Sequence, residues 1–514
     1  MSTAIEPVVV EPVVVRPSIT SARSLWRSWI VYAVSSVASR LVGFLMLPIY
    51  TRVLSPEEYG IRAMVTVGVD LVGMVCSLGL TTAMIRHYTG DGAEARRHPE
   101  AVSTAYATGA LVLGSGALLG MLGAPWLAML VLGDAAYAGY LRLGLVSLFF
   151  VNTMEIGLAY LRVRQRAATV AVVGLSTLGL TLATNLVLVV WLRQGVAGIL
   201  YGEIFTFGLC SLILARLTLR EVGVRVSPAL ARRMVVYGAP LTLMPFAWLL
   251  VNRSDGVFLT HHGSLGATGI YALAIQCAQV LLLAVVLPFR DAWEPGQFEV
   301  ARQPDGGRTY QRMFQTFAFT VVIAAFTLAI GAEDVIGVMA APRFHAAATV
   351  VPILLAAHVV MGISLFFNSV LLVKNRTPLL GGVALVTAAV NVTANALLVP
   401  RFLAVGAACS RLIALMVMAA LTWWIAERLS PQRLDFVAFA KVVGLAVAGF
   451  GVSRLLPDET LIVSLALKAV LVLAVVGLSI VIGAVDRRDV RHLLALLLEC
   501  LRLPRARPAP DTVR

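Results

Sequence analysis

Residues 378–426 read PLLGGVALVTAAVNVTANALLVPRFLAVGAACSRLIALMVMAALTWWIA, and this stretch decides the fold class. Its only charged residues are Arg401 and Arg411. A membrane-spanning helix needs about 20 consecutive apolar residues to cross a hydrocarbon core of about 30 Å. The stretch is long enough for two such helices, which we place at residues 378–399 and 402–426. The sequence here therefore predicts two consecutive membrane spans.

Apolar runs of similar length recur along almost all of the 514 residues. The chain is 59% apolar and 13% charged, whereas soluble domains carry about 25% charged residues. We therefore predict an all-α integral membrane protein in which no segment forms a separate soluble domain. Fourteen spans are expected, at residues 29–49, 63–83, 103–123, 140–161, 169–192, 196–216, 234–251, 270–289, 315–332, 350–373, 378–399, 402–426, 436–456 and 461–484.

Basic residues are distributed unequally between the two sides of this arrangement. The N-terminal tail, the even-numbered connections and the C-terminal tail carry 30 of the 41 lysines and arginines, and the odd-numbered connections carry 8. We call these the arginine-rich and the arginine-poor side. Cytoplasmic loops are enriched in basic residues, so both termini are predicted to be cytoplasmic. The net charge of +14 is explained by membrane orientation, and no nucleic-acid partner is expected.

The segments outside the spans are short. Residues 1–24 lack the features of a cleavable signal peptide and are expected to form a disordered cytoplasmic tail. Residues 218–233 are predicted to be a basic cytoplasmic linker. Residues 487–503, RRDVRHLLALLLECLRL, are expected to form an amphipathic helix at the membrane interface. Residues 504–514 are predicted to be a disordered tail.

An internal repeat relates the two halves of the chain. An offset of 210 residues superposes spans five and six on spans eleven and twelve, with polar residues matching as well as apolar ones. The matched polar pairs are Arg164 with Lys374, Gln165 with Asn375, Arg166 with Arg376, Thr177 with Thr387 and Asn185 with Asn395. Because transporters are often built from two related halves, we predict two parallel six-helix lobes. They are residues 25–217 and 234–426, with helices 436–484 appended, and the cavity between the lobes is the expected substrate site.

Three stretches resemble a known family. Residues 35–60 read SSVASRLVGFLMLPIYTRVLSPEEYG, which is similar to the opening of the Wzx-like polysaccharide or oligosaccharide flippases. These proteins belong to the multidrug/oligosaccharidyl-lipid/polysaccharide (MOP) exporter superfamily. Residues 395–414, NALLVPRFLAVGAACSRLIA, resemble the segment between the family's helices 11 and 12. Asp255, together with GIYALA at 269–274, resembles its helix 7–8 junction.

The resemblance implies a MATE-like fold in the bacterial inner membrane and a function in envelope polysaccharide biosynthesis. The implied activity is movement of an undecaprenyl-pyrophosphate-linked oligosaccharide repeat unit to the outer leaflet, by alternating access coupled to an ion gradient. Membrane lipids are the expected surroundings, and a polysaccharide polymerase and other assembly proteins are expected partners of a monomer. No enzymatic activity and no cofactor are expected.

Three arginines are the candidates for binding a pyrophosphate. A charge inside the hydrocarbon region is costly and is therefore a functional candidate, and guanidinium supplies a permanent forked donor for phosphate. Arg40 lies in the middle of the first span; it either faces the cavity or pairs with Asp70. Arg253 ends helix seven, where it either contacts substrate or forms a structural pair with Asp255. Arg411 begins span twelve and either lines the cavity or bonds a carbonyl group.

Four acids are the candidates for ion coupling: Asp70, Glu155, Glu203 and Asp255. Each falls within or at the end of a predicted span, where a carboxylate can bind a proton or sodium ion. A structural role remains the alternative for each of them. No cluster of residues with metal-ligand spacing is present, and the five cysteines are scattered without a CxxC motif.

Other functions remain as alternatives. A lipid II flippase and a drug/cation antiporter are rivals within the same superfamily. An integral-membrane glycosyltransferase or polymerase is the rival of another class, and it would need a large acidic outer loop. The predicted outer connections are short. The sequence also lacks a GxxxxGK[ST] phosphate-binding loop, which argues against ATP hydrolysis.

Overall fold

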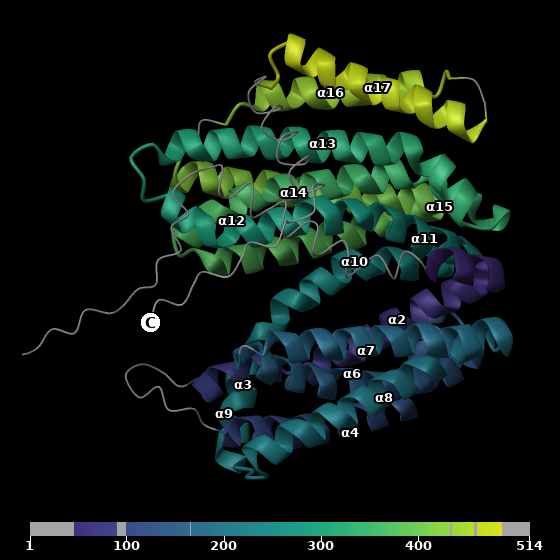
Figure 1. The fold of residues 1–514 in the computed structure, drawn as a ribbon, viewed down its shortest axis with the longest axis vertical. Coiled ribbons are helices and arrows are strands. Elements are labelled where there is room, and N and C mark those ends of the chain that lie inside the picture. The colour runs from purple at the N-terminus through teal and green to yellow at the C-terminus, as the bar shows by residue number, and fades with distance from the viewer. Residues whose placement is uncertain (1–45, 90–98, 165, 432–433, 457–459, 486–514) are drawn as a thin grey trace, which may run out of the picture.

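The computed structural model describes residues 46–89, 99–164, 166–431, 434–456 and 460–485. The predicted tails 1–24 and 504–514, the amphipathic helix 487–503 and Arg40 lie outside these residues. The described part of the chain contains helices and no strands. Two groups of helices lie one above the other in Figure 1, α2–α9 below and α11–α17 above, with α10 between them. The predicted all-α architecture of two lobes is thus confirmed.

The N-terminal lobe follows a short helical segment at residues 46–53. Its helices are α2 (Pro56–Ser77), α3 (Leu80–Thr89), α4 (Glu100–Leu122), α5 (Ala124–Leu132), α6 (Ala138–Val163), α7 (Ala167–Asn185), α8 (Gly195–Val222) and α9 (Pro228–Gly238). A π-helical turn at Leu186–Trp191 prolongs α7, and a short 3-10 turn at Ala135–Tyr137 precedes α6.

The C-terminal lobe contains the second series of long helices. They are α10 (Leu243–His262), α11 (Leu265–Leu281), α12 (Leu287–Val300), α13 (Gly306–Met339), α14 (Val351–Val373) and α15 (Thr377–Leu429). A π-helical turn at Leu282–Val286 joins α11 to α12, and 3-10 turns lie at Ala239–Thr242 and Pro342–Thr349. The appended pair α16 (Phe436–Ser453) and α17 (Leu461–Val481) packs beside α13.

Helix α2 begins earlier than its apolar run. Ser55 accepts a hydrogen bond from the Glu58 N–H, and the Glu58 carboxylate accepts one from the Ser55 N–H. This reciprocal capping box satisfies two backbone donors at the helix start, and Pro56 favours the first helical position. As a result, Arg62 lies on the second turn of α2 instead of in a connection.

The 53-residue helix α15 contains two predicted spans. A straight helix of this length would measure about 80 Å, whereas one span crosses about 30 Å of hydrocarbon. Its backbone leaves the helical region at Leu403, with φ 48° and ψ −124°. A Cβ added at Gly406 would lie 2.4 Å from the Leu398 carbonyl oxygen, so the chain turns back on itself there. Asn391 before the kink and Arg411 after it both contact the same part of α10. The stretch quoted first is therefore a helical hairpin.

The chain passes between the lobes through a bent helix. Residues Pro228–Thr242 and Pro245–His262 meet at an angle of 46°. Met234 of α9 packs in a core of the N-terminal lobe, whereas Ala247 and Val251 of α10 pack in a core of the C-terminal lobe. The predicted lobe boundary at residue 234 thus falls inside α9, and the predicted linker 218–233 contains the end of α8 and the start of α9.

Eleven helices in the described residues are long and apolar enough to cross a membrane, or twelve when the bent pair counts as one span. With the bent pair counted, these helices contain every predicted span from 63–83 onward. The 53-residue α15 contains two of those spans, 378–399 and 402–426. The first predicted span, 29–49, lies outside the described residues except for its last four positions. The total of fourteen therefore stays a prediction.

Candidate functional site

An ion pair joins the two lobes in the middle of their helices. Arg253 of α10 donates to Asp70 of α2 over 2.9 Å, and the two side chains are 43% and 35% exposed. Apolar residues precede and follow Asp70 on α2, whereas Arg253 lies in the polar run Asn252–Asp255 of α10. Charges are costly in hydrocarbon, so this partly exposed pair between the lobes is a candidate for a functional site.

The pair belongs to a longer polar stripe on α2. Arg62, Thr66 and Asp70 follow each other at intervals of four residues and so share one helix face. Arg62 donates to the Thr66 hydroxyl and to the carboxylate of Glu203 on α8. The stripe therefore connects a pair within the N-terminal lobe to Arg253 of the other lobe. Its four described charges form two neutral pairs.

Arg253 and Asp255 do not pair with each other. Residues two apart on a helix are separated by about 200° and point to opposite faces. Asp255 instead pairs with Arg411 over 2.7 Å, inside the C-terminal lobe, with side chains 1% and 4% exposed. The Tyr271 hydroxyl donates to Asp255 over 2.6 Å, and Arg411 also donates to the Asn252 carbonyl. The predicted alternative of an Arg253–Asp255 pair is thus wrong.

The Asp255–Arg411 pair lies beside a buried group of amides. Ser254 donates to Asn391 over 2.7 Å, and Asn395 donates to both of these side chains. Four atoms of this region make no hydrogen bond with the described residues: Asp255 Oδ1, Arg411 Nε, Asn391 Nδ2 and Asn395 Oδ1. Removal of either charge would leave its partner buried and uncompensated.

The repeated asparagines occupy related places in the two lobes. Asn395 bonds Ser254, on the helix that opens the C-terminal lobe. Asn185, its match at an offset of 210, contacts Tyr50 on the helical segment that opens the N-terminal lobe. Both asparagines are buried. Asn395 therefore joins the eleventh predicted span to α10, at the start of the C-terminal lobe. Asn185 joins the fifth predicted span to the helical segment 46–53, at the start of the N-terminal lobe.

The remaining predicted residues lie apart from the interlobe pair. Glu155 lies 3.5 Å from Arg162 in a half-exposed pair near the arginine-rich end of α6. Glu203 pairs with Arg62. Arg62 was not identified from the sequence as a site residue, because the predicted spans 29–49 and 63–83 leave it in the connection between them. The capping box at Ser55–Glu58 is the signal that identifies its place on α2.

The lobes touch closely at their arginine-poor ends. A Cβ at Gly60 of α2 would lie 1.9 Å from the Leu265 carbonyl oxygen of α11, and one at Gly269 would lie 1.9 Å from the Pro56 carbonyl oxygen. The two backbones are therefore in direct contact, which only glycine at both positions allows.

Side chains reinforce this closure. The Tyr59 hydroxyl donates to Gln276 across the interface. Arg343, in the 3-10 turn after α13, donates to the carbonyl oxygens of Thr51 and Arg52 over 3.1 Å. The His261 ring lies 2.8 Å from the Leu130 carbonyl oxygen. These contacts hold the two lobes together on the side with few basic residues.

Comparisons with known proteins agree with this architecture. Residues 25–298 match the family model of polysaccharide biosynthesis proteins. A search of curated protein sequences finds no match. Among solved structures, lipid II flippase MurJ in an inward closed conformation has a TM-score of 0.66 at 12% identity, covering 88% of this chain and 99% of that one.

Two solved conformations of a multidrug resistance MATE family transporter also match. The inward-facing one has a TM-score of 0.63 at 14% identity, covering 80% of this chain and 96% of that one. The outward-facing one has a TM-score of 0.52 at 14% identity, covering 81% and 99%. The predicted MATE-like fold is thus confirmed. The chain belongs to the polysaccharide biosynthesis protein family and is a multi-pass membrane protein that shares the fold of a MATE family transporter and of lipid II flippase MurJ.

Proposed function

We propose that this protein is a flippase of the bacterial inner membrane. It moves an undecaprenyl-pyrophosphate-linked oligosaccharide repeat unit from the cytoplasmic to the outer leaflet, where a polymerase consumes it. The family assignment supports a role in polysaccharide biosynthesis. The observation that carries the proposal is the half-exposed Asp70–Arg253 pair between the lobes.

Arg253 supplies the chemistry that a pyrophosphate requires. Its guanidinium is permanently charged and donates two parallel hydrogen bonds to a carboxylate or a phosphate. In this structure Asp70 occupies this donor. A pyrophosphate brings more negative charge than one carboxylate and displaces Asp70 from Arg253. Arg40, in the first span, is the second proposed contact. Arg411 is committed to Asp255 in the lobe core, so we assign it a structural role.

Alternating access follows from where the lobes are joined. The glycine contact of α2 with α11 closes the arginine-poor side, so substrate enters from the arginine-rich side. Binding breaks the Asp70–Arg253 bridge between the lobes and allows them to move relative to each other. Separation of Gly60 from Leu265 then opens the path to the outer leaflet.

Asp70 is the proposed coupling residue. Once a pyrophosphate holds Arg253, the Asp70 carboxylate lacks its partner in a partly apolar place, where a proton or sodium ion stabilises it. Glu203 retains Arg62, Asp255 retains Arg411, and Glu155 retains Arg162, so none of these acids is released by substrate. Release of the ion and return of Asp70 to Arg253 restore the starting arrangement.

The test is a leaflet-exchange assay. The purified protein is placed in liposomes that contain a fluorescent undecaprenyl-pyrophosphate oligosaccharide, and the label in each leaflet is followed. Loss of a charge-assisted hydrogen bond costs about 1.5–3 kcal/mol, so Arg253→Ala is expected to slow exchange by about ten- to hundredfold. Arg454→Ala is the control, because Arg454 lies at the end of the appended helix α16 and pairs with Glu333 of α13, away from the interlobe pair.

The outcomes separate the alternatives. Unchanged exchange in Arg253→Ala contradicts the role of this arginine. Exchange of lipid II but of no other lipid-linked sugar identifies a lipid II flippase. Export of organic cations without lipid exchange identifies a drug antiporter. Chain elongation of the labelled sugar in the liposomes would identify a glycosyltransferase or polymerase.

A further inference from the structure

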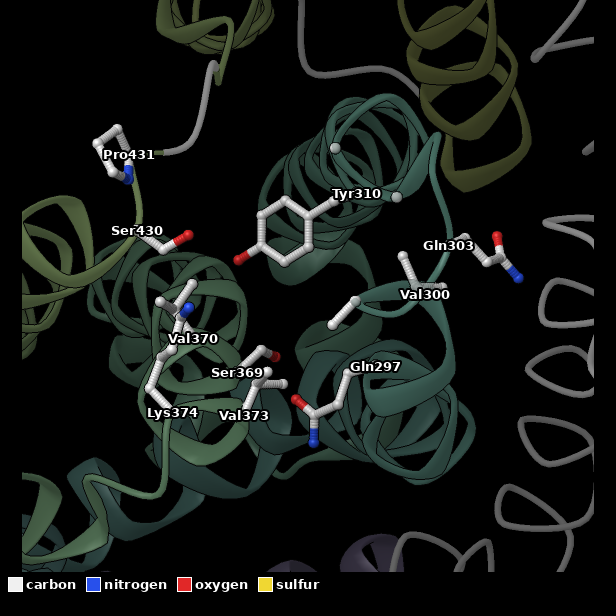
Figure 2. A pocket seen from close by; sticks show the side chains of 13 residues that line it. Gln297, Val300, Gln303, Tyr310, Ser369, Val370, Val373, Lys374, Ser430 and Pro431 are labelled. Carbon is white, nitrogen blue, oxygen red and sulfur yellow. The ribbon is translucent and has the colours of Figure 1, made fainter.

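A second pocket lies in the C-terminal lobe, away from the interlobe pair. Its cavity of about 340 Å³ lies at the arginine-rich ends of α12, α13, α14 and α15, and Figure 2 shows its lining. Its polar side chains come from Gln297, Gln303, Tyr310, Ser369, Lys374 and Ser430. Small-molecule sites occupy about 300 Å³ or more and combine an apolar wall with a few convergent polar groups, and this pocket meets both criteria.

One wall of the pocket suits an anion. Gly306 and Gly307 begin the 34-residue helix α13 and line the cavity. Helix N-termini carry partial positive charge and present N–H groups to anions, phosphate above all. A Cβ at Gly307 would meet nothing within 4 Å, so open space faces Gly307, whereas the Gly306 N–H donates to the Gln303 carbonyl over 3.0 Å. Lys374 at the end of α14 also lines the cavity and adds a full positive charge.

Another wall suits a hydrogen-bond donor. Gln297 is 4% exposed, and its Nε2 donates to the Glu294 carbonyl over 2.9 Å. That bond fixes the orientation of the amide, and the buried Oε1 has no hydrogen-bond partner in the described residues. Figure 2 shows this oxygen turned toward Ser369 and Val373. A buried acceptor without a donor costs about 1–3 kcal/mol, and a ligand hydroxyl or ammonium group would satisfy it.

The remaining groups of the wall are held in place by the fold. The Tyr310 hydroxyl donates to the Phe366 carbonyl, and the Trp293 indole donates to Ser369 over 2.7 Å. Trp293, Tyr310 and Phe366 also form a packed aromatic cluster. The pocket is therefore preformed on a rigid base, as expected of a binding site.

We propose that this pocket binds a phosphate ester that carries a hydroxyl or ammonium group. The phosphate lies between Lys374 and the Gly306–Gly307 helix start, and the donor group bonds Gln297 Oε1. Such a group is presented by a phospholipid headgroup of the adjacent leaflet and by a soluble phosphate ester such as glycerol 3-phosphate. The pocket is separate from the proposed translocation path, so the inference does not depend on the transported substrate.

The experiment compares two lysines on the same side of the membrane. Lys374 lines the pocket, whereas Lys441 on α16 donates to the Ile482 carbonyl and lies outside it. Full-length wild type, Lys374→Ala, Gln297→Leu, Gly307→Glu and Lys441→Ala are purified in detergent. Native mass spectrometry counts retained phosphatidylglycerol, with phosphatidylcholine, whose headgroup has no hydrogen-bond donor, as the comparison lipid, and thermal unfolding is measured with and without glycerol 3-phosphate. Size-exclusion chromatography verifies that each variant is folded.

Wild type and Lys441→Ala are expected to bind phosphatidylglycerol or glycerol 3-phosphate equally. The three pocket variants are expected to bind it about tenfold more weakly, because one charge-assisted contact contributes about a factor of ten in affinity. Retained phosphatidylglycerol that glycerol 3-phosphate does not displace identifies a lipid site. A thermal shift with glycerol 3-phosphate, without lipid retention, identifies a soluble ligand. Equal behaviour of Lys374→Ala and Lys441→Ala toward both probes overturns the proposal.

Discussion

Two ion pairs that start from the same turn of α10 have opposite environments. Arg253 reaches out of its lobe to Asp70 and stays about 40% exposed. Asp255 reaches into its lobe to Arg411 and is almost fully buried. The first pair can exchange one partner for water or a phosphate, whereas the second cannot be opened without leaving a bare charge in the core. Burial, and not the type of residue, separates the transport candidate from the structural pair.

The largest expected effect comes from opening the buried pair. Arg411→Ala leaves the Asp255 carboxylate uncompensated, which costs about 3–5 kcal/mol. We expect a large loss of thermal stability in detergent, measured by the temperature at which the protein elutes as aggregate. Arg253→Ala serves as the matched control and should change little.

A double substitution sharpens this prediction. Asp255→Asn combined with Arg411→Met removes both charges and is expected to recover much of the lost stability, because no lone ion remains. A double variant as unstable as Arg411→Ala alone would show that the charge is not what the core requires.

The sequence predicted the fold well because bilayer thickness fixes the length of a span. The runs at 378–399 and 402–426 were identifiable from composition alone, and the Asn185–Asn395 match indicated two related lobes. The MATE-like architecture and the family followed from these features and from the motif at residues 35–60.

The partners of the charges were not predictable in the same way. Arg253 and Asp255 are neighbours in the sequence but point to opposite faces, and their true partners are far away along the chain. Arg62 was misplaced because an apolar window does not detect a helix start, which the capping box determines. The break of helix seven at Ala239–Thr242 depends on which lobe each half packs against, and hydropathy carries no such information.

The second largest effect is expected at the closed end of the interlobe interface. Gly60→Ala places a Cβ 1.9 Å from the Leu265 carbonyl oxygen, so α2 and α11 must separate. Overpacking of this kind costs about 1–3 kcal/mol, which disfavours the closed arrangement by about five- to hundredfold. Spin labels on the arginine-poor ends of α2 and α11 should report a longer distance.

Gly331 on α13 supplies the control, since a Cβ there meets nothing within 4 Å. Gly331→Ala is expected to leave the label distance unchanged. The same distance in Gly60→Ala and wild type would contradict the close contact of the two backbones. Transport should fall in Gly60→Ala, while the buried Asp255–Arg411 core keeps its stability.

A smaller effect on stability is expected for the half-exposed ion pair of Asp70 and Arg253. Asp70→Asn removes one charge of a half-exposed pair, and such pairs are worth about 0–1 kcal/mol. We expect thermal stability to change by no more than this, while lipid exchange loses its dependence on the ion gradient. Exchange that still follows an imposed proton or sodium gradient in Asp70→Asn would assign coupling to another acid.

The smallest effect is expected where a pair is exposed and joins the appended helices to the C-terminal lobe, away from the interlobe pair. Arg454 contacts Glu333, with side chains 46% and 53% exposed, and its guanidinium lies 5.0 Å from the centre of the Phe450 ring. Arg454→Ala should change stability by less than about 1 kcal/mol and leave exchange intact. An effect as large as that of Arg411→Ala would mean that burial does not rank these pairs, and the distinction between Arg253 and Arg411 would then need another physical basis.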